Sequence, residues 1–205
     1  HGARLELIRV DLFAVATVAL LAILAASIWV RWPGGRPTSA VAATVFGIAY
    51  TGGTLGFGYV LRYHPYAIGP RAGAALLALP LVLTWTSDIG AYFVGRALGR
   101  RKLIPAVSPG KTIAGAVGAL LLCMVVAWAY DRWVLVPHAS LAMRLPGIGS
   151  TLVAPLLFGA LVCIAAQVGD LAESLLKRDA GVKDSSTLLP GHGGVLDRLD
   201  SLFFV

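Results

Sequence analysis

Long apolar runs separated by short polar segments dominate this chain. The pattern contains no extended alternation of the kind expected for strands. Apolar runs of about 18 residues or more with few charges are typical of membrane-spanning helices. Because lipid forces backbone groups to pair within each segment, the pattern predicts an all-α, polytopic membrane helical bundle of about five spans, in one domain over 1–205. The expected spans are 11–30, 39–61, 72–95, 112–136 and 150–169.

Composition agrees with a membrane protein. Hydrophobic residues make up 58% of the chain and charged residues 13%, with a mean hydropathy of +0.80, whereas soluble domains are about 25% charged. The net charge is +7, but no basic stripe interleaved with aromatic residues is present, so nucleic acid is not expected as a partner. Cys123 and Cys163 lie inside apolar runs and are predicted to be packing residues. The chain stops at "LFFV", as another apolar run begins, which predicts a piece of a longer protein.

Basic residues predict the orientation of the spans. The loop 96–111 carries five Lys or Arg and no acidic residue. Placing 31–37, 96–111 and the tail after 169 on one side gives that side eleven of the seventeen basic residues. The positive-inside rule then puts this side in the cytoplasm.

Polar residues gather where the fifth apolar run ends. Asp170, Glu173, Ser174 and Lys177 are spaced i, i+3, i+4 and i+7, which places them on one helical face. Glu173 and Lys177 have the spacing of an ordinary surface ion pair, and the stripe also fits a solvated helix end. Asp170 favours function, because ionisable residues at membrane depth are usually functional.

A glycine-rich turn follows in "PGHGGVLDRLD", residues 190–200. Its glycines allow backbone amides to approach an anion closely. Asp197 and Asp200 are one helical turn apart, a plausible pair of ligands for a hard cation such as magnesium. A simple turn before a capped helix with solvated aspartates is the alternative.

Two upstream segments have similar chemistry. "SPGKT", Ser108 to Thr112, is not a P-loop, because Pro105 replaces the first glycine and no strand is expected before it. Its Lys111 is predicted at a helix N-terminus, which suits a phosphate. Asp88 lies within an apolar span, which favours a functional role. These four elements combine cations for phosphate with acids for a metal, as phosphoryl and nucleotidyl transfer require.

The segment 174–200 resembles the signature of the phosphatidate cytidylyltransferase family, also called CDP-diacylglycerol synthases. It reads S-x-x-K-R, four residues, K-D, and then P-x-H-G-G-x-x-D-R-x-D, with no gap. "SDIGAYFVGRALGRRKLIPAVSPGKT" also resembles the family's upstream block, so the resemblance covers about 84–200. It implies a nucleotidyltransferase that makes CDP-diacylglycerol and pyrophosphate from CTP and phosphatidate, in phospholipid biosynthesis.

The resemblance also implies roles for single residues. Asp170, Lys177 and Asp197 are the expected catalytic residues. A magnesium ion is the expected cofactor, with a second cation left open, at Asp170 and Asp197 with Asp88 and Asp200 close by. The expected substrate-binding residues are Ser108, Lys111, Thr112, Arg178, Lys183, Asp184, His192, Gly193, Gly194 and Arg198.

The chain departs from the family pattern at one position, and the resemblance also implies partners and a location. The family commonly has a glutamate where this chain has Ala114, so Lys111 is expected to lack a carboxylate partner and to be mobile until phosphate arrives. His192 is expected to position a phosphate or its loop. The implied partners are CTP, phosphatidate and membrane lipids, in a homodimer. The implied location is the bacterial plasma membrane, with the polar active site on the cytoplasmic side.

Two other functions are compatible with these residues. The first is a CTP-dependent kinase of a lipid alcohol such as a polyprenol, phytol or dolichol. It would release CDP and a phosphorylated lipid. The second is a membrane transporter or scaffold, in which Asp88 would be an ion site. That function leaves the clustering of acids, bases and glycines unexplained.

Overall fold

The computed structural model describes residues 12–30, 35–63, 70–137, 151–188 and 193–205. It divides into two compact units, His1–Gly53 and Thr54–Val205. The first unit contains helix α1 (Leu12–Val30), helix α2 (Pro37–Ile48) and the π-helix η4 (Ala49–Gly53). The glycine-rich stretch "YTGGTLGFGY", residues 50–59, begins within this π-helical turn. All the described candidate site residues lie in the second unit.

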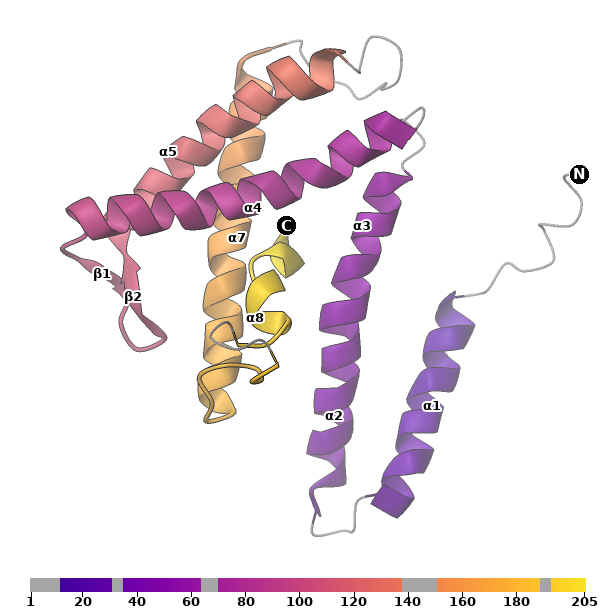
Figure 1. Cartoon of the computed structure of the whole chain (residues 1–205). Coiled ribbons are helices and arrows are strands. Elements are labelled where there is room, and N and C mark those ends of the chain that lie inside the picture. Colours follow the sequence, from indigo (N-terminus) through magenta and orange to yellow (C-terminus); the bar gives the residue numbers. More distant parts are fainter. Residues whose placement is uncertain (1–11, 31–34, 64–69, 138–150, 189–192) are drawn as a thin grey trace, which may run out of the picture. The chain divides into compact units, whose positions relative to one another are not determined.

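The second unit is a helical bundle with a small hairpin. Figure 1 shows α4, α5 and α7 as its long helices, with α8 beside α7. Its helices are α3 (Thr54–Arg62), α4 (Pro70–Leu98), α5 (Ile113–Tyr130), η5 (Asp131–Leu135), α7 (Val153–Asp179), α8 (Leu196–Leu199) and η6 (Leu202–Phe204). Its strands are β1 (Lys102–Ile104) and β2 (Ser108–Thr112).

The expected membrane architecture is confirmed. Within the described residues, four helices are long and apolar enough to cross a membrane, at Pro37–Arg62, Arg71–Leu98, Ile113–Leu135 and Val153–Asp179. The first expected span, 11–30, corresponds to a shorter apolar helix over Ala14–Val30. The protein is therefore an integral, mainly helical membrane protein.

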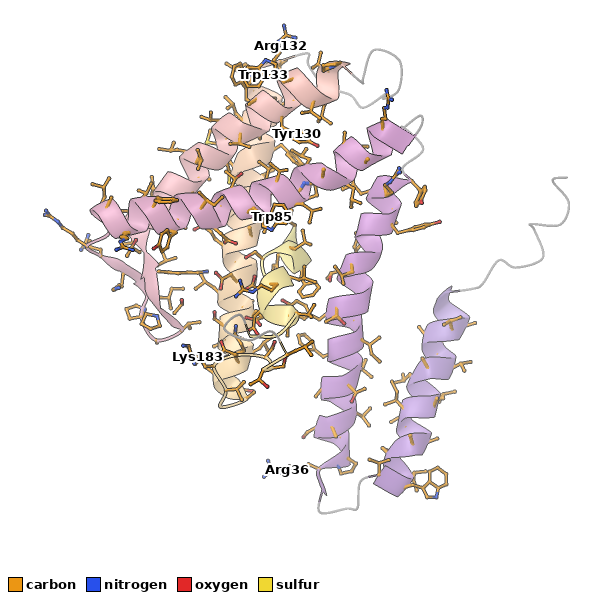
Figure 2. All side chains as sticks on the ribbon, viewed as in Figure 1. Arg36, Trp85, Tyr130, Arg132, Trp133 and Lys183 are labelled. Carbon is orange, nitrogen blue, oxygen red and sulfur yellow. The ribbon has the colours of Figure 1, made fainter. Side chains whose placement is uncertain are left out.

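Small residues let α4 and α5 cross closely. A Cβ on Gly90 would lie 2.9 Å from the Cα of Ala119, and one on Gly115 would lie 2.6 Å from the carbonyl oxygen of Ala91. Small residues at helix crossings are the usual means of close packing in membranes. Cys123 and Cys163 are both buried and unpaired as disulfides, which confirms their packing role. Tyr130, labelled in Figure 2, donates a hydrogen bond from α5 to the carbonyl oxygen of Ala75 on α4 at 2.8 Å.

The strands correct one expectation. No strand was expected, yet the loop after α4 returns as an antiparallel hairpin in which Lys102 pairs with Thr112 and Ile104 with Ser108. Lys111 therefore lies on β2 and not on a helical first turn. Thr112 is the N-cap of α5, and its hydroxyl accepts a hydrogen bond from the Gly115 amide at 3.1 Å.

Candidate functional site

A cavity of about 150 Å³ lies where the hairpin meets three helices. Its wall is mainly apolar but carries polar side chains from α4, the hairpin and α7, and small residues from α5. A cavity with a few convergent polar groups is the ordinary form of a ligand site. The lining residues are Ser87, Asp88, Ala91, Tyr92, Leu103, Gly110, Lys111, Thr112, Gly115, Ala116, Gln167 and Asp170.

Lys111 and Asp170 form an ion pair in this cavity. The ammonium of Lys111 lies 2.6 Å from Oδ2 of Asp170 and 3.5 Å from the carbonyl oxygen of Gln167. The expectation that Lys111 lacks a carboxylate partner is therefore wrong. Ala114 cannot supply one, but α7 does, because the hairpin places Lys111 against that helix.

Three carboxylates stand close enough to repel one another. Asp88 on α4 interacts electrostatically with Asp170 and Asp200, and Asp200 interacts with Asp170. Burial and the negative charge of Asp170 raise the pKa of Asp200, against hydrogen bonds from Ser201. Repelling carboxylates of this kind are stabilised by a cation.

Lys177 forms a second cluster with two acids. Its ammonium lies 2.5 Å from Oε2 of Glu173 and 2.7 Å from Oδ1 of Asp197. Glu173 is fully buried, with 0% exposure. The interpretation of Glu173 and Lys177 as an ordinary surface pair is therefore wrong.

Asp197 fastens the glycine-rich segment to α7. Its Oδ2 accepts hydrogen bonds from the Ser185 amide (2.9 Å), the Ser185 hydroxyl (2.6 Å) and the Gly194 amide (2.7 Å). Burial opposes the charge of Asp197, but the bonds from Lys177, Ser185 and Gly194 outweigh it and hold its pKa well below the usual range. Gly193 has φ 77°, and a Cβ there would lie 2.7 Å from Oδ2 of Asp197.

The predicted site residues divide into two groups. Those brought together are Asp88, Lys111, Thr112 and Asp170 at the cavity, and Lys177, Asp197, Asp200, Gly193 and Gly194 around the tail.

The remaining predicted residues lie outside these two clusters. Ser108 lies on β2 but does not line the cavity. Arg178 is exposed and donates to the carbonyl oxygen of Val182 at 3.4 Å. Lys183, labelled near the end of α7 in Figure 2, and Asp184 are exposed, as is Arg198, whose charge acts on Asp88. His192 lies outside the described residues.

Sequence reasoning missed three contributors. Glu173 was considered only as a surface residue, and Gln167 and Ser185 were not considered as site residues. Gln167 donates to Sγ of Cys163 at 3.1 Å and to the carbonyl oxygen of Ala116 at 3.3 Å. Two features of the sequence pointed to these residues. Gln167 is an amide within an apolar run, and Ser185 directly follows Lys183 and Asp184.

The donor chemistry fits a hard divalent cation that is also held by phosphates. Among the residues that the structure describes, no three His, Cys, Asp or Glu side chains converge closely enough to hold a metal by themselves. Magnesium needs only one or two carboxylates when substrate phosphates and waters complete its shell. Asp200 suits that role, and so does Asp170 once Lys111 has moved from its Oδ2 to a phosphate. Asp197 would be available only after Lys177 or Ser185 released one of its oxygens.

Comparison with known proteins places this arrangement in a family. The model of the cytidylyltransferase family matches residues 3–205, so the likeness extends beyond 84–200 into the first apolar helices. A phosphatidate cytidylyltransferase of Haemophilus influenzae is 43% identical over 143 residues, covering 69% of this chain and 46% of the relative. One from Pseudomonas aeruginosa is 45% identical over 133 residues, covering 65% and 45%.

A third relative covers more of the chain. The phosphatidate cytidylyltransferase of Brucella melitensis is 39% identical over 191 residues, covering 93% of this chain and 60% of the relative. The chain spans about half the length of the first of these curated relatives. A family match over nearly all of its residues shows that this chain belongs to the cytidylyltransferase family.

Proposed function

We propose that this protein transfers a cytidylyl group from CTP to phosphatidate, giving CDP-diacylglycerol and pyrophosphate. The observation that carries the proposal is the cavity between the hairpin and helices α4, α5 and α7, where Lys111 and Asp170 meet beside Asp88. The names of the relatives supply the substrates. The cavity has the chemistry of a site for phosphates and a hard cation. The protein lies in a membrane, which fits a second substrate that is a lipid.

In the proposed reaction a phosphatidate oxygen attacks the α-phosphorus of CTP. The new phosphorus–oxygen bond forms as the bond to the β-phosphate oxygen breaks, and pyrophosphate leaves with that electron pair. The attacking phosphate is already an anion, so no strong general base is required. His192, on this proposal, positions a phosphate or its loop.

Side chains of this protein supply positioning and charge. Lys111 and Lys177 neutralise phosphate oxygens, and the Gly194 segment is held near them by Asp197. Asp170 and Asp200 would hold magnesium, with Asp88 nearby. When bound, magnesium neutralises charge on the phosphate oxygens. The second cation and the homodimer remain predictions from the family resemblance.

A product assay tests the proposal. Purified protein is incubated with phosphatidate, magnesium and CTP labelled at the α-phosphate, and the lipid is extracted. Label in the lipid, with release of pyrophosphate, is expected. If only γ-label enters a lipid, and CDP is released, the protein is a CTP-dependent kinase. If no nucleotide is consumed, both enzymatic readings are wrong.

Lys111→Ala should lower kcat/KM about ten- to a hundredfold. A hydrogen bond to a charged group is worth about 1.5–3 kcal/mol, and about 1.4 kcal/mol is a factor of ten. The measurement uses correctly inserted protein. The matched control is Lys102→Ala, an exposed lysine on the other strand of the hairpin, which should stay within twofold. Equal activity of the two variants would show that Lys111 does not contact the reacting phosphates.

The site is proposed to face the cytoplasm of a bacterial plasma membrane. Cysteines at Arg100 and Tyr63, in a background lacking Cys123 and Cys163, should react with a membrane-impermeant maleimide from opposite sides. Both positions are exposed, and α4 separates them. Arg100 should label in inside-out vesicles and Tyr63 in right-side-out vesicles. The loop 137–149 joins the expected spans 112–136 and 150–169 and is predicted to lie on the outer side, but it falls almost wholly outside the described residues. Labelling of both cysteines from one face would contradict the predicted topology.

A further inference from the structure

Glu173 is buried, although its spacing along the sequence is that of a surface residue. It lies on the face of α7 toward the tail, with 0% of its surface exposed. Its Oε2 contacts the ammonium of Lys177 at 2.5 Å. Neither Oε1 nor Oε2 has a partner with hydrogen-bond geometry among the described residues, so the contact with Lys177 is an ion pair. A buried carboxylate is unfavourable unless it is paired, so Lys177 is the contact that makes this position tolerable.

The ammonium of Lys177 has three hydrogens to donate. Two carboxylate oxygens lie within ion-pair distance of it, one from Glu173 and one from Asp197. The side chain of Lys177 is 16% exposed. At least one N–H is therefore left for an acceptor that arrives from the accessible side.

The two acids hold Lys177 differently. Asp197 also accepts three hydrogen bonds from Ser185 and Gly194, so its position depends on the glycine-rich segment. Glu173 contacts only Lys177 among the described polar groups, and both residues are on α7, one helical turn apart. Movement of the segment would displace Asp197 but leave the contact with Glu173 in place.

We propose that Glu173 is a positioning residue that keeps the Lys177 ammonium directed at the phosphates of the nucleotide. The inference rests on the proposed function, because it takes CTP as the ligand. Glu173 acts through Lys177 and does not itself touch the substrate. Glu173 holds the ammonium through one carboxylate oxygen from within the same helix, so the lysine stays in place when Asp197 or its segment moves.

A double-mutant cycle on Glu173 and Lys177 tests this. Glu173→Gln keeps the shape of the side chain and removes its charge. It should lower kcat about ten- to thirtyfold while the KM for phosphatidate stays within twofold. Lys177→Met should lower kcat further, and the double variant should be no slower than Lys177→Met alone. Glu173→Asp, which keeps the charge on a shorter side chain, should recover part of the loss.

The matched control is Asp179→Asn, which makes the same acid-to-amide change at an exposed position of α7. It should stay within twofold of the parent. If Glu173→Gln and Lys177→Met have multiplicative effects, Glu173 acts independently of Lys177 and the proposal fails. If Glu173→Gln lowers the melting temperature so far that the protein unfolds, the cycle is run with Glu173→Asp.

Binding of magnesium pyrophosphate separates this inference from the proposed reaction. The parent should bind it about tenfold more tightly than Glu173→Gln, in calorimetry that needs no turnover. A parent that binds with this contrast but makes no CDP-diacylglycerol would refute the proposed function alone. Equal binding by the two proteins, including no binding by either, would refute the role of Glu173 even if the parent is active.

Discussion

Asp170→Asn is expected to reduce kcat/KM at least about a thousandfold, the largest effect of any single change at this site. The substitution removes the partner of Lys111 and one of the carboxylates proposed for magnesium. A thousandfold loss corresponds to about 4 kcal/mol, which is the order expected when a charge-assisted pair and a metal contact are lost together. The measurement is CDP-diacylglycerol formation over a range of magnesium concentrations, with folding checked by thermal unfolding.

A neighbouring substitution serves as the control for Asp170. The hydroxyl of Ser174 donates to Oδ1 of Asp170 at 3.3 Å, a long hydrogen bond. Ser174→Ala should therefore change kcat/KM less than about fivefold. Near-normal activity of Asp170→Asn at low magnesium would remove Asp170 from the proposed metal site.

Asp197→Asn is expected to lower kcat/KM about a thousandfold, or about 4 kcal/mol, for a different reason. Asp197 accepts hydrogen bonds from Lys177, from the amide and hydroxyl of Ser185 and from the Gly194 amide. Hydrogen bonds to a charged acceptor are worth about 1.5–3 kcal/mol each. The neutral asparagine side chain would keep only part of this hydrogen-bond free energy. The glycine-rich segment should therefore detach from α7.

Hydrogen exchange distinguishes this role from metal binding. The amides of Ser185 and Gly194 should exchange faster in Asp197→Asn, in the absence of magnesium and substrate, and remain unchanged in Asp170→Asn. If exchange at both amides is unaffected while activity is lost, Asp197 acts on the metal or substrate and not as the anchor of the segment.

The long helices could be predicted from the sequence, because lipid leaves few alternatives for an apolar run. The hairpin could not. Its strands contain three and five residues, with no apolar alternation to mark them. The ends of α4 and α5 bring them together, and the Ile113 amide closes the hairpin on the carbonyl oxygen of Arg101 at 3.0 Å. Lys111 was consequently placed on a helix that begins one residue after β2 ends.

The residue types at the site were predictable, but their pairing was not. Lys111 meets Asp170 from a distant part of the chain, and nothing local to either residue specifies the other. The C-terminal segment packs against α7 (Figure 1), and Glu173 on that helix is fully buried. Gly169 makes that packing possible, since a Cβ there would lie 2.9 Å from the carbonyl oxygen of Asp200. Spacing along α7 alone gave Glu173 the pattern of a surface residue.

The order in which the chain is synthesised bears on the pairing of charges on α7. Synthesis proceeds from the N-terminus, so Lys111 exists before Asp170 emerges, and Lys177 follows Glu173 within one helical turn. Asp170 and Glu173 therefore each have a counter-ion available before Asp197 is translated. Unpaired charges are unfavourable in a bilayer, and this order makes a cationic partner available to Asp170 and Glu173 while α7 enters the membrane. The glycine-rich tail then docks onto a helix whose insertion did not depend on it.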